Sequence, residues 1–145
     1  MHVSWKLVYE PGTLKAVSRK NGKEVLAKEI KTAGKPAKLV LSADRNTISA
    51  NGNDLSFATV KVLDSEGNLV PHADNLVKFE ITGNAAIVGV DNGSPISHEP
   101  FKANYRKAFN GLCLAVLQSG EKSGKVTLTA TSEGLEKASV EIVLK

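Results

Sequence analysis

The sequence has little of the chemistry on which many active sites depend. Its 145 residues include one cysteine, three histidines and one tryptophan. A single cysteine excludes an internal disulfide and any metal site built from several cysteines. His2, His72 and His98 lie far apart, and none has a second ligand at the spacing of a repeated metal motif. We therefore predict no metal and no other cofactor.

Long hydrophobic runs are also absent. Nothing approaches the roughly 20 consecutive apolar residues of a membrane-spanning helix, so no membrane span is predicted. Residues 1–5 lack the basic and apolar regions of a secretory signal peptide. The net charge is +4, but its densest group of lysines and arginines is interleaved with Glu24 and Glu29. Because no basic stripe with stacking aromatics is present, no nucleic-acid partner is predicted.

Signatures of catalysis are missing as well. The Gly-x-Ser-x-Gly motif does not occur, and no histidine forms a known nucleophile motif with a serine or with Cys113. Cys113 lies in the apolar run 112–117, which predicts a buried and inert thiol. Asp91 and Glu99 would suit acid–base chemistry only if the fold brought them together, and nothing in the sequence does so. We predict no catalytic residue in this chain.

The first thirty residues alternate in the manner of short strands. Residues 3–9, 14–17 and 24–30 predict a three-stranded meander, with Asn21-Gly22 as the strongest hairpin signal. Such a sheet has one apolar face and little to bury it against. Residues 32–36 are small and polar and end in a proline, which indicates a linker. We interpret residues 1–33 as the C-terminal strands of a preceding β-sandwich domain.

Residues 34–145 predict an immunoglobulin-like β-sandwich without any required helix. Turn signals recur every eight to twelve residues between runs rich in valine, threonine and isoleucine. In the run after the long loop, the alternation selects Leu112, Leu114 and Val116. The seven expected strands are 38–43 (with Ile48 as a short extension), 55–63, 77–81, 87–90, 112–116, 126–130 and 140–144.

The stretch from Asp91 to Gly111 interrupts this alternation for about twenty residues. Ordered loops of that length are uncommon and tend to be functional. Its side chains suggest a sugar-binding surface, in which aromatic rings contact C–H groups and polar groups contact hydroxyls. The candidate ligand-binding residues are Asn92, Phe101, Asn104, Tyr105 and Arg106, with Phe109 beside them. The alternative, which we favour, is that the aromatics pin the loop across one end of the sandwich and that Phe109 lies in the core.

These residues resemble a known family. The stretches LSADRNTISANGNDLSFATVKVLDSEGNLVPHADNLVKFEITG and VGVDNGSPISHEPFKANYRKAFNGLCLAVLQSG are similar to the C-terminal immunoglobulin-like domain of Bacteroides-type glycoside hydrolase family 2 enzymes, the β-galactosidase-like ones. The head, VSWKLVYEPGTLKAVSRKNGKEV, resembles the end of the preceding domain in those enzymes. In that family the acid and the nucleophile are two glutamates on an upstream TIM barrel, so the resemblance carries no catalytic residue onto this chain.

The resemblance implies a non-catalytic accessory module of a secreted or periplasmic β-galactosidase-like glycosidase. Its expected partners are other domains of the parent glycosidase, and the parent is expected to act on β-galactoside-type glycans. One alternative is a carbohydrate-binding module with a glycan as its partner. A second alternative, from a looser similarity of residues 38–82 to invasin-type immunoglobulin repeats, is a spacer of a bacterial surface adhesin.

Overall fold

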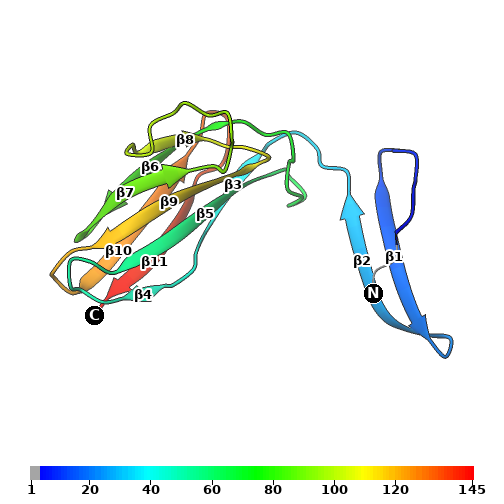
Figure 1. The fold of residues 1–145 in the computed structure, drawn as a ribbon, viewed down its shortest axis with the longest axis horizontal. Coiled ribbons are helices and arrows are strands. Elements are labelled where there is room, and N and C mark those ends of the chain that lie inside the picture. The colour runs from blue at the N-terminus through cyan, green and yellow to red at the C-terminus, as the bar shows by residue number, and fades with distance from the viewer. Residues whose placement is uncertain (1–3) are drawn as a thin grey trace. The chain divides into compact units, whose positions relative to one another are not determined.

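Eleven β-strands in three sheets make up the secondary structure of residues 4–145, the part of the chain that the computed structural model describes (Figure 1). No helix occurs in this range. The described residues therefore contain no helix long and apolar enough to cross a membrane. The chain divides into two units, one ending at Thr32 and the other running from Ala33 to Lys145.

The first unit is a β-hairpin. Strands β1 (Thr13–Lys20) and β2 (Lys23–Lys31) pair antiparallel around Asn21 and Gly22. Both turn residues have positive φ, 53° and 76°, as a two-residue turn of type I′ requires. Thr32 closes the open end, because its backbone N–H and its hydroxyl both bond to Gly12. The predicted hairpin at Asn21-Gly22 is therefore confirmed.

The first strand of the predicted meander, residues 3–9, is wrong for the described residues. Residues 4–10 form no strand, and Val3, with which that strand was to begin, lies outside the described residues. Trp5, Leu7 and Tyr9 are 67–74% exposed, although they alternate as predicted. Alternation marks one apolar face, but a strand also needs a hydrogen-bonding partner and a surface on which to bury that face. Neither is present for this segment in the structure.

The second unit is a two-layer β-sandwich, which confirms the predicted fold class. One layer is a four-stranded sheet in the order β3-β5-β9-β7, and the other is a five-stranded sheet in the order β4-β11-β10-β6-β8. The four-stranded sheet contains β3 (Lys38–Ala43), β5 (Leu55–Leu63), β7 (Ala85–Asp91) and β9 (Leu112–Ser119). The five-stranded sheet contains β4 (Thr47–Ile48), β6 (Leu76–Thr82), β8 (Tyr105–Lys107), β10 (Gly124–Thr131) and β11 (Ala138–Leu144).

Seven of these nine strands coincide with the predicted runs, and the two short ones, β4 and β8, were not predicted as separate strands. Ile48 was expected to extend the first strand. It lies instead in β4, which pairs parallel with β11 in the opposite sheet. The chain therefore changes sheets between Ala43 and Thr47, and a two-residue strand gives no periodic signal from which this crossing could be read.

The core lies between the two sheets. Its completely buried members include Ala58, Val60 and Val62 of β5 and Val77 and Leu128 from the opposite layer. Strand β9 presents Cys113, Ala115 and Leu117 to this core, whereas Leu112, Leu114 and Val116 lie on the outer face and are half-buried. The face indicated by Leu112, Leu114 and Val116 in the sequence is thus the wrong one, because the strand is apolar on both faces.

Candidate functional site

The candidate site is the connection from β7 to β9, which joins two strands of the four-stranded sheet and contributes one strand to the five-stranded sheet. It leaves the four-stranded sheet at Asp91, enters the five-stranded sheet as β8, and returns to β9. Strand β8 pairs antiparallel with β6, so that Arg106 lies opposite Val77. Further backbone bonds hold the loop at both sheets, since Val90 donates to the Phe101 carbonyl and Phe79 donates to the Asn104 carbonyl. The connection is therefore an ordered bridge between the layers.

Its return into β9 depends on a tight turn. Asn110 and Gly111 have positive φ of 52° and 76°, and Phe109 and Leu112 exchange backbone hydrogen bonds across them. A Cβ at Gly111 would come within 2.4 Å of the Val70 carbonyl oxygen. Only glycine fits there, because it combines the left-handed conformation with the close backbone approach.

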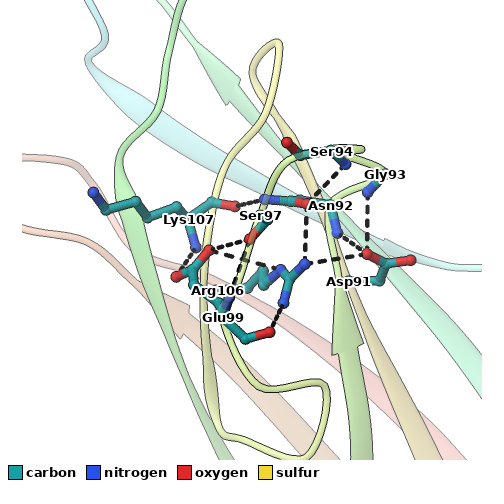
Figure 2. Close-up of polar contacts among 8 residues, drawn as sticks. All are labelled: Asp91, Asn92, Gly93, Ser94, Ser97, Glu99, Arg106 and Lys107. Atoms are coloured by element: carbon teal, nitrogen blue, oxygen red, sulfur yellow. Dashed lines mark hydrogen bonds and ion pairs between the residues drawn. The ribbon is translucent and has the colours of Figure 1, made fainter.

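Arg106 is the centre of the connection. Its side chain is 1% exposed, and its guanidinium contacts groups from the beginning and the middle of the loop (Figure 2). Nη1 donates to the Glu99 carbonyl at 2.9 Å, and Nη2 donates to the Asn92 Oδ1 at 3.2 Å and the Asp91 Oδ1 at 3.4 Å. The Nε lies 3.8 Å from the Glu99 Oε2 without a hydrogen bond. A buried cation is tolerated only with such partners.

The partners of Arg106 are held by the loop itself. Asp91 Oδ1 also accepts from the backbone N–H groups of Asn92 and Gly93, at 2.7 and 3.1 Å. Glu99 accepts from the Ser97 hydroxyl through Oε2 and from the Lys107 N–H through Oε1, each at 3.2 Å. Figure 2 shows these groups converging on one guanidinium.

The structure thus brings Asp91 and Glu99 together, but it does so through a cation. Both carboxylates form ion pairs with Arg106, at 3.4 and 3.8 Å. Because the guanidinium lies between them and is buried, the arrangement has the form of a structural ion-pair network. Fixed carboxylates on a buried arginine stabilise a loop by holding its ends in place.

Of the five predicted ligand residues, Asn92 and Arg106 are bound to one another. Asn92 also donates to the Lys107 carbonyl at 3.0 Å and accepts from the Ser94 N–H at 3.0 Å, so its amide is engaged on three sides. Asn104 is exposed, and its backbone carbonyl accepts a hydrogen bond from the Phe79 N–H of β6. A glycan-binding role for the five residues stays a prediction.

The aromatic residues do not act as the pins that we favoured from the sequence. Phe101 is 63% exposed and Tyr105 is 39% exposed. The Phe101 ring lies over the Arg106 guanidinium, with its centroid 5.2 Å from Cζ, which is cation–π geometry. Phe109 is half-buried and lies outside the buried core cluster. The loop is pinned by Arg106 and its acceptors instead.

The sequence reasoning missed β8 and the parts played by Ser97, Glu99 and Lys107. One signal was available, because Arg106 and Ala108 alternate with Tyr105 and Lys107 in the manner of a strand. A three-residue strand is too short for that alternation to stand out.

Cys113 lies in the core beneath this connection. Burial raises the pKa of the Cys113 thiol to about 12, so the nucleophilic thiolate is not formed near neutral pH. The predicted burial of the Cys113 thiol is confirmed. Within residues 4–145, no group of three or more histidine, cysteine, aspartate or glutamate side chains is arranged to hold a metal ion.

Comparison with known families assigns both parts of the chain. Residues 39–141 match the model of the glycoside hydrolase family 2 C-terminal domain 5, and residues 1–26 match a domain of unknown function, DUF4982. The chain belongs to the glycoside hydrolase family 2 C-terminal domain 5 family. The resemblance seen in the sequence, including that of the head, is thereby confirmed.

Individual relatives agree with this assignment. Beta-galactosidase BoGH2A of Bacteroides ovatus is 56% identical over 142 residues, which are 98% of this chain and 17% of that enzyme. The crystal structure of a glycosyl hydrolase family 2 member from Bacteroides cellulosilyticus matches at TM-score 0.90 and 45% identity, over 97% of this chain and 18% of that one. A beta-glycosidase from Bacteroides vulgatus matches at TM-score 0.90 and 29% identity, over the same shares. The chain spans less than a fifth of the length of these relatives.

Proposed function

We propose that this chain is a non-catalytic accessory module of a larger family 2 glycosidase, in which it packs against other domains of the same enzyme. The observation that carries the proposal is the uncovered apolar face of the hairpin β1–β2. Directly paired residues of an antiparallel ladder share a face, so Leu14 and Ile30 lie on the same face, and Leu26 lies there opposite Ser18. These three side chains are 52%, 62% and 66% exposed.

The opposite face of the hairpin has a different character. There Lys15 pairs with Glu29, with Nζ 3.1 Å from Oε1, and Arg19 lies opposite Glu24. The contrast is one of degree, because Lys28 lies opposite Ala16 on the first face and Val17 lies opposite Ala27 on the second. A two-stranded hairpin with exposed apolar side chains is marginal when alone. Covering a large aliphatic side chain contributes roughly 1.5–3 kcal/mol, so a partner domain on the apolar face would stabilise both components.

A substitution series in the larger enzyme tests this packing. We expect Leu26→Ser and Ile30→Ser each to lower its melting temperature by several degrees, because each removes apolar surface from the proposed interface. The same substitutions should leave the 145-residue chain unchanged, because both side chains are exposed there. Val17→Ser is the matched control, since Val17 lies on the opposite face of the hairpin from Leu26 and Ile30. An enzyme that is equally insensitive to all three substitutions would refute the domain-packing role.

The proposed substrate class is β-galactoside-type glycans. It is supported by the names of relatives called beta-galactosidase, among them BoGH2A and a protein of Thermoanaerobacter pseudethanolicus that is 32% identical. A protein of Formosa agariphila named putative beta-glucuronidase is 34% identical, so similar chains occur in relatives named for either activity. Hydrolysis of nitrophenyl β-galactoside in preference to the β-glucuronide by the larger enzyme is the deciding measurement.

The proposed location is the periplasm or the extracellular space, as the family resemblance implies. Fractionation of the source cells with an antibody against this domain tests it, and recovery of the antigen with cytoplasmic markers would refute it.

A further inference from the structure

The net charge of the chain is carried by its first unit. Residues 1–32 contain seven lysines and arginines and three glutamates, a net charge of +4, which is also that of the whole chain. Residues 33–145 contain twelve basic and twelve acidic residues, so the sandwich unit is neutral. The hairpin unit is therefore the part of the chain that attracts an anionic partner.

The unbalanced part of this charge lies on one face of the hairpin. Lys28 lies opposite Ala16, and Lys20, two residues beyond Ser18 in β1, lies opposite Lys23. Strand residues alternate between faces, and directly paired residues share one. The three lysines are therefore on the uncovered apolar face described above. No acidic residue of β1 or β2 lies on that face.

The opposite face balances its charges within the hairpin. Lys15 forms an ion pair with Glu29, and Arg19 lies opposite Glu24. Both acidic residues of the two strands are thus on this opposite face. The three lysines of the apolar face, by contrast, form none of the ion pairs within residues 4–145. The apolar face is left with three positive charges and no counter-charge.

The arrangement at the turn is unfavourable for an isolated hairpin. Lys20 and Lys23 are directly opposite one another on either side of the Asn21-Gly22 turn. Like charges that are directly paired across two strands destabilise the pairing. A carboxylate placed against both ammonium groups would offset this repulsion, and neither strand of the hairpin supplies one on that face.

We propose that the partner of this face is a protein surface of the same enzyme that is apolar where it meets Leu14, Leu26 and Ile30 and carries carboxylates toward the Asn21-Gly22 turn. The proposal rests on the domain packing proposed above and specifies the chemistry of the partner. Positive and negative groups that meet across an interface fix its register and exclude wrong partners.

The open edges of the hairpin favour a protein over an anionic membrane. Strands β1 and β2 form a two-stranded sheet, so each has one edge whose backbone N–H and C=O groups lack a strand partner among the described residues. A protein can pair such an edge by adding a strand, whereas hydrocarbon offers these groups no partner. A membrane would thus match the lysines and the leucines but not the strand edges.

Reversal of a single charge in the larger enzyme tests the proposal. We expect Lys28→Glu to lower its melting temperature by several degrees at low salt, and by roughly half of that or less at high salt, because salt screens charges at a distance. Lys31→Glu is the matched control. Lys31 is also exposed in β2 and outside every ion pair of residues 4–145, but it lies on the opposite face, opposite Thr13. It should leave the melting temperature close to that of the wild type.

Lys28→Met distinguishes an acidic partner from one that is only apolar. If a carboxylate faces Lys28, its removal leaves that carboxylate without a cation, and we expect a lower melting temperature. A purely apolar partner would pack against the methionine, and the melting temperature would rise. A rise would therefore overturn the proposal.

The outcome is separable from that of the domain packing itself. If Leu26→Ser destabilises the larger enzyme while Lys28→Glu behaves like Lys31→Glu, the packing stands and the acidic partner is refuted. If none of the three has an effect, both proposals fall. Sedimentation of the 145-residue chain with vesicles of phosphatidylcholine and phosphatidylglycerol covers the lipid alternative. Binding to them that Lys28→Glu abolishes and Lys31→Glu spares would overturn the protein partner in favour of an anionic membrane.

Discussion

Arg106 was selected from the sequence as a ligand residue, and the structure gives it a different role inside the protein. A lone arginine between a tyrosine and a lysine is compatible with a surface site or with a buried pin. Only the fold distinguishes the two, because the burial of Arg106 depends on β8 pairing with β6. The acceptors Asp91 and Glu99 were noticed in the sequence, but their meeting point was not visible there.

Replacing Arg106 should therefore destabilise the sandwich. We expect Arg106→Ala to lower the free energy of unfolding by about 3 kcal/mol, because it removes one partner of a buried ion pair and leaves a cavity. Lys125→Ala is the control, since the pair of Lys125 with Glu141 is 71% and 62% exposed and such pairs contribute about 0–1 kcal/mol. Urea denaturation measures both. A loss at Arg106 no greater than that at Lys125 would show that the network does not hold the loop.

Asp64, at the end of β5, binds the segment that leads into the first strand of the sandwich. Its Oδ2 accepts from the Gly34 N–H at 2.8 Å and from the Asn68 amide at 3.0 Å. These hydrogen bonds, with that from Gly34 the largest cause, lower the pKa of the Asp64 carboxyl from 3.8 to about 2. A lowered folded-state pKa means that the unfolded chain takes up the proton first. The stabilisation is fully present above about pH 4 and is lost as the pH falls through about 2.

The expected result is a fall in the free energy of unfolding between about pH 4 and pH 2, part of which disappears in Asp64→Asn. Denaturant unfolding at a series of pH values measures it. Glu66→Gln is the control in the same turn, because the Glu66 side chain accepts none of these bonds, and it should keep the wild-type profile. If Asp64→Asn and the wild type lose stability in parallel across this range, the hydrogen bonds of Asp64 do not contribute in the way proposed.

At the scale of elements, the alternation of apolar and polar residues was sufficient to identify the buried face of a strand when only one of its faces is apolar. Val77 and Phe79 of β6 and Val126 and Leu128 of β10 follow this pattern, and all four are buried. Strand β9 is apolar on both faces, so its alternation gives no preference. Its orientation follows from register, since Cys113 pairs with Val60 and therefore shares the inner face. Register is a long-range property that a single strand does not encode.

The same reasoning explains the segment from residue 4 to residue 10. Its alternating side chains have the composition of a strand, but strand formation depends on a neighbour as well as on composition. Strand β8 is the opposite case, because its composition is unremarkable and its neighbour β6 makes it a strand. Sequence patterns therefore identified the long, one-sided strands and missed the elements whose structure depends on a partner.

At the scale of the whole molecule, the two units differ in the burial on which stability depends. Every residue of β1 and β2 is exposed, whereas β5 and β9 alternate between buried and less buried positions within the sandwich. Local opening free energy falls as buried apolar contact falls. We therefore expect the backbone amides of the hairpin to exchange with solvent deuterium far faster than those of β5 and β9.

Hydrogen exchange followed by NMR measures this difference in the 145-residue chain and in the larger enzyme. In the 145-residue chain we expect the amides of β1 and β2 to exchange with little protection, while those of Val60 and Ala115 exchange only through global unfolding of the sandwich. In the larger enzyme the hairpin should gain protection, because the proposed partner domain covers Leu14, Leu26 and Ile30. Equal protection of the hairpin in both contexts would mean that no partner covers this face. The exchange rates thus test, in one measurement, whether the exposed face of the hairpin is an interface.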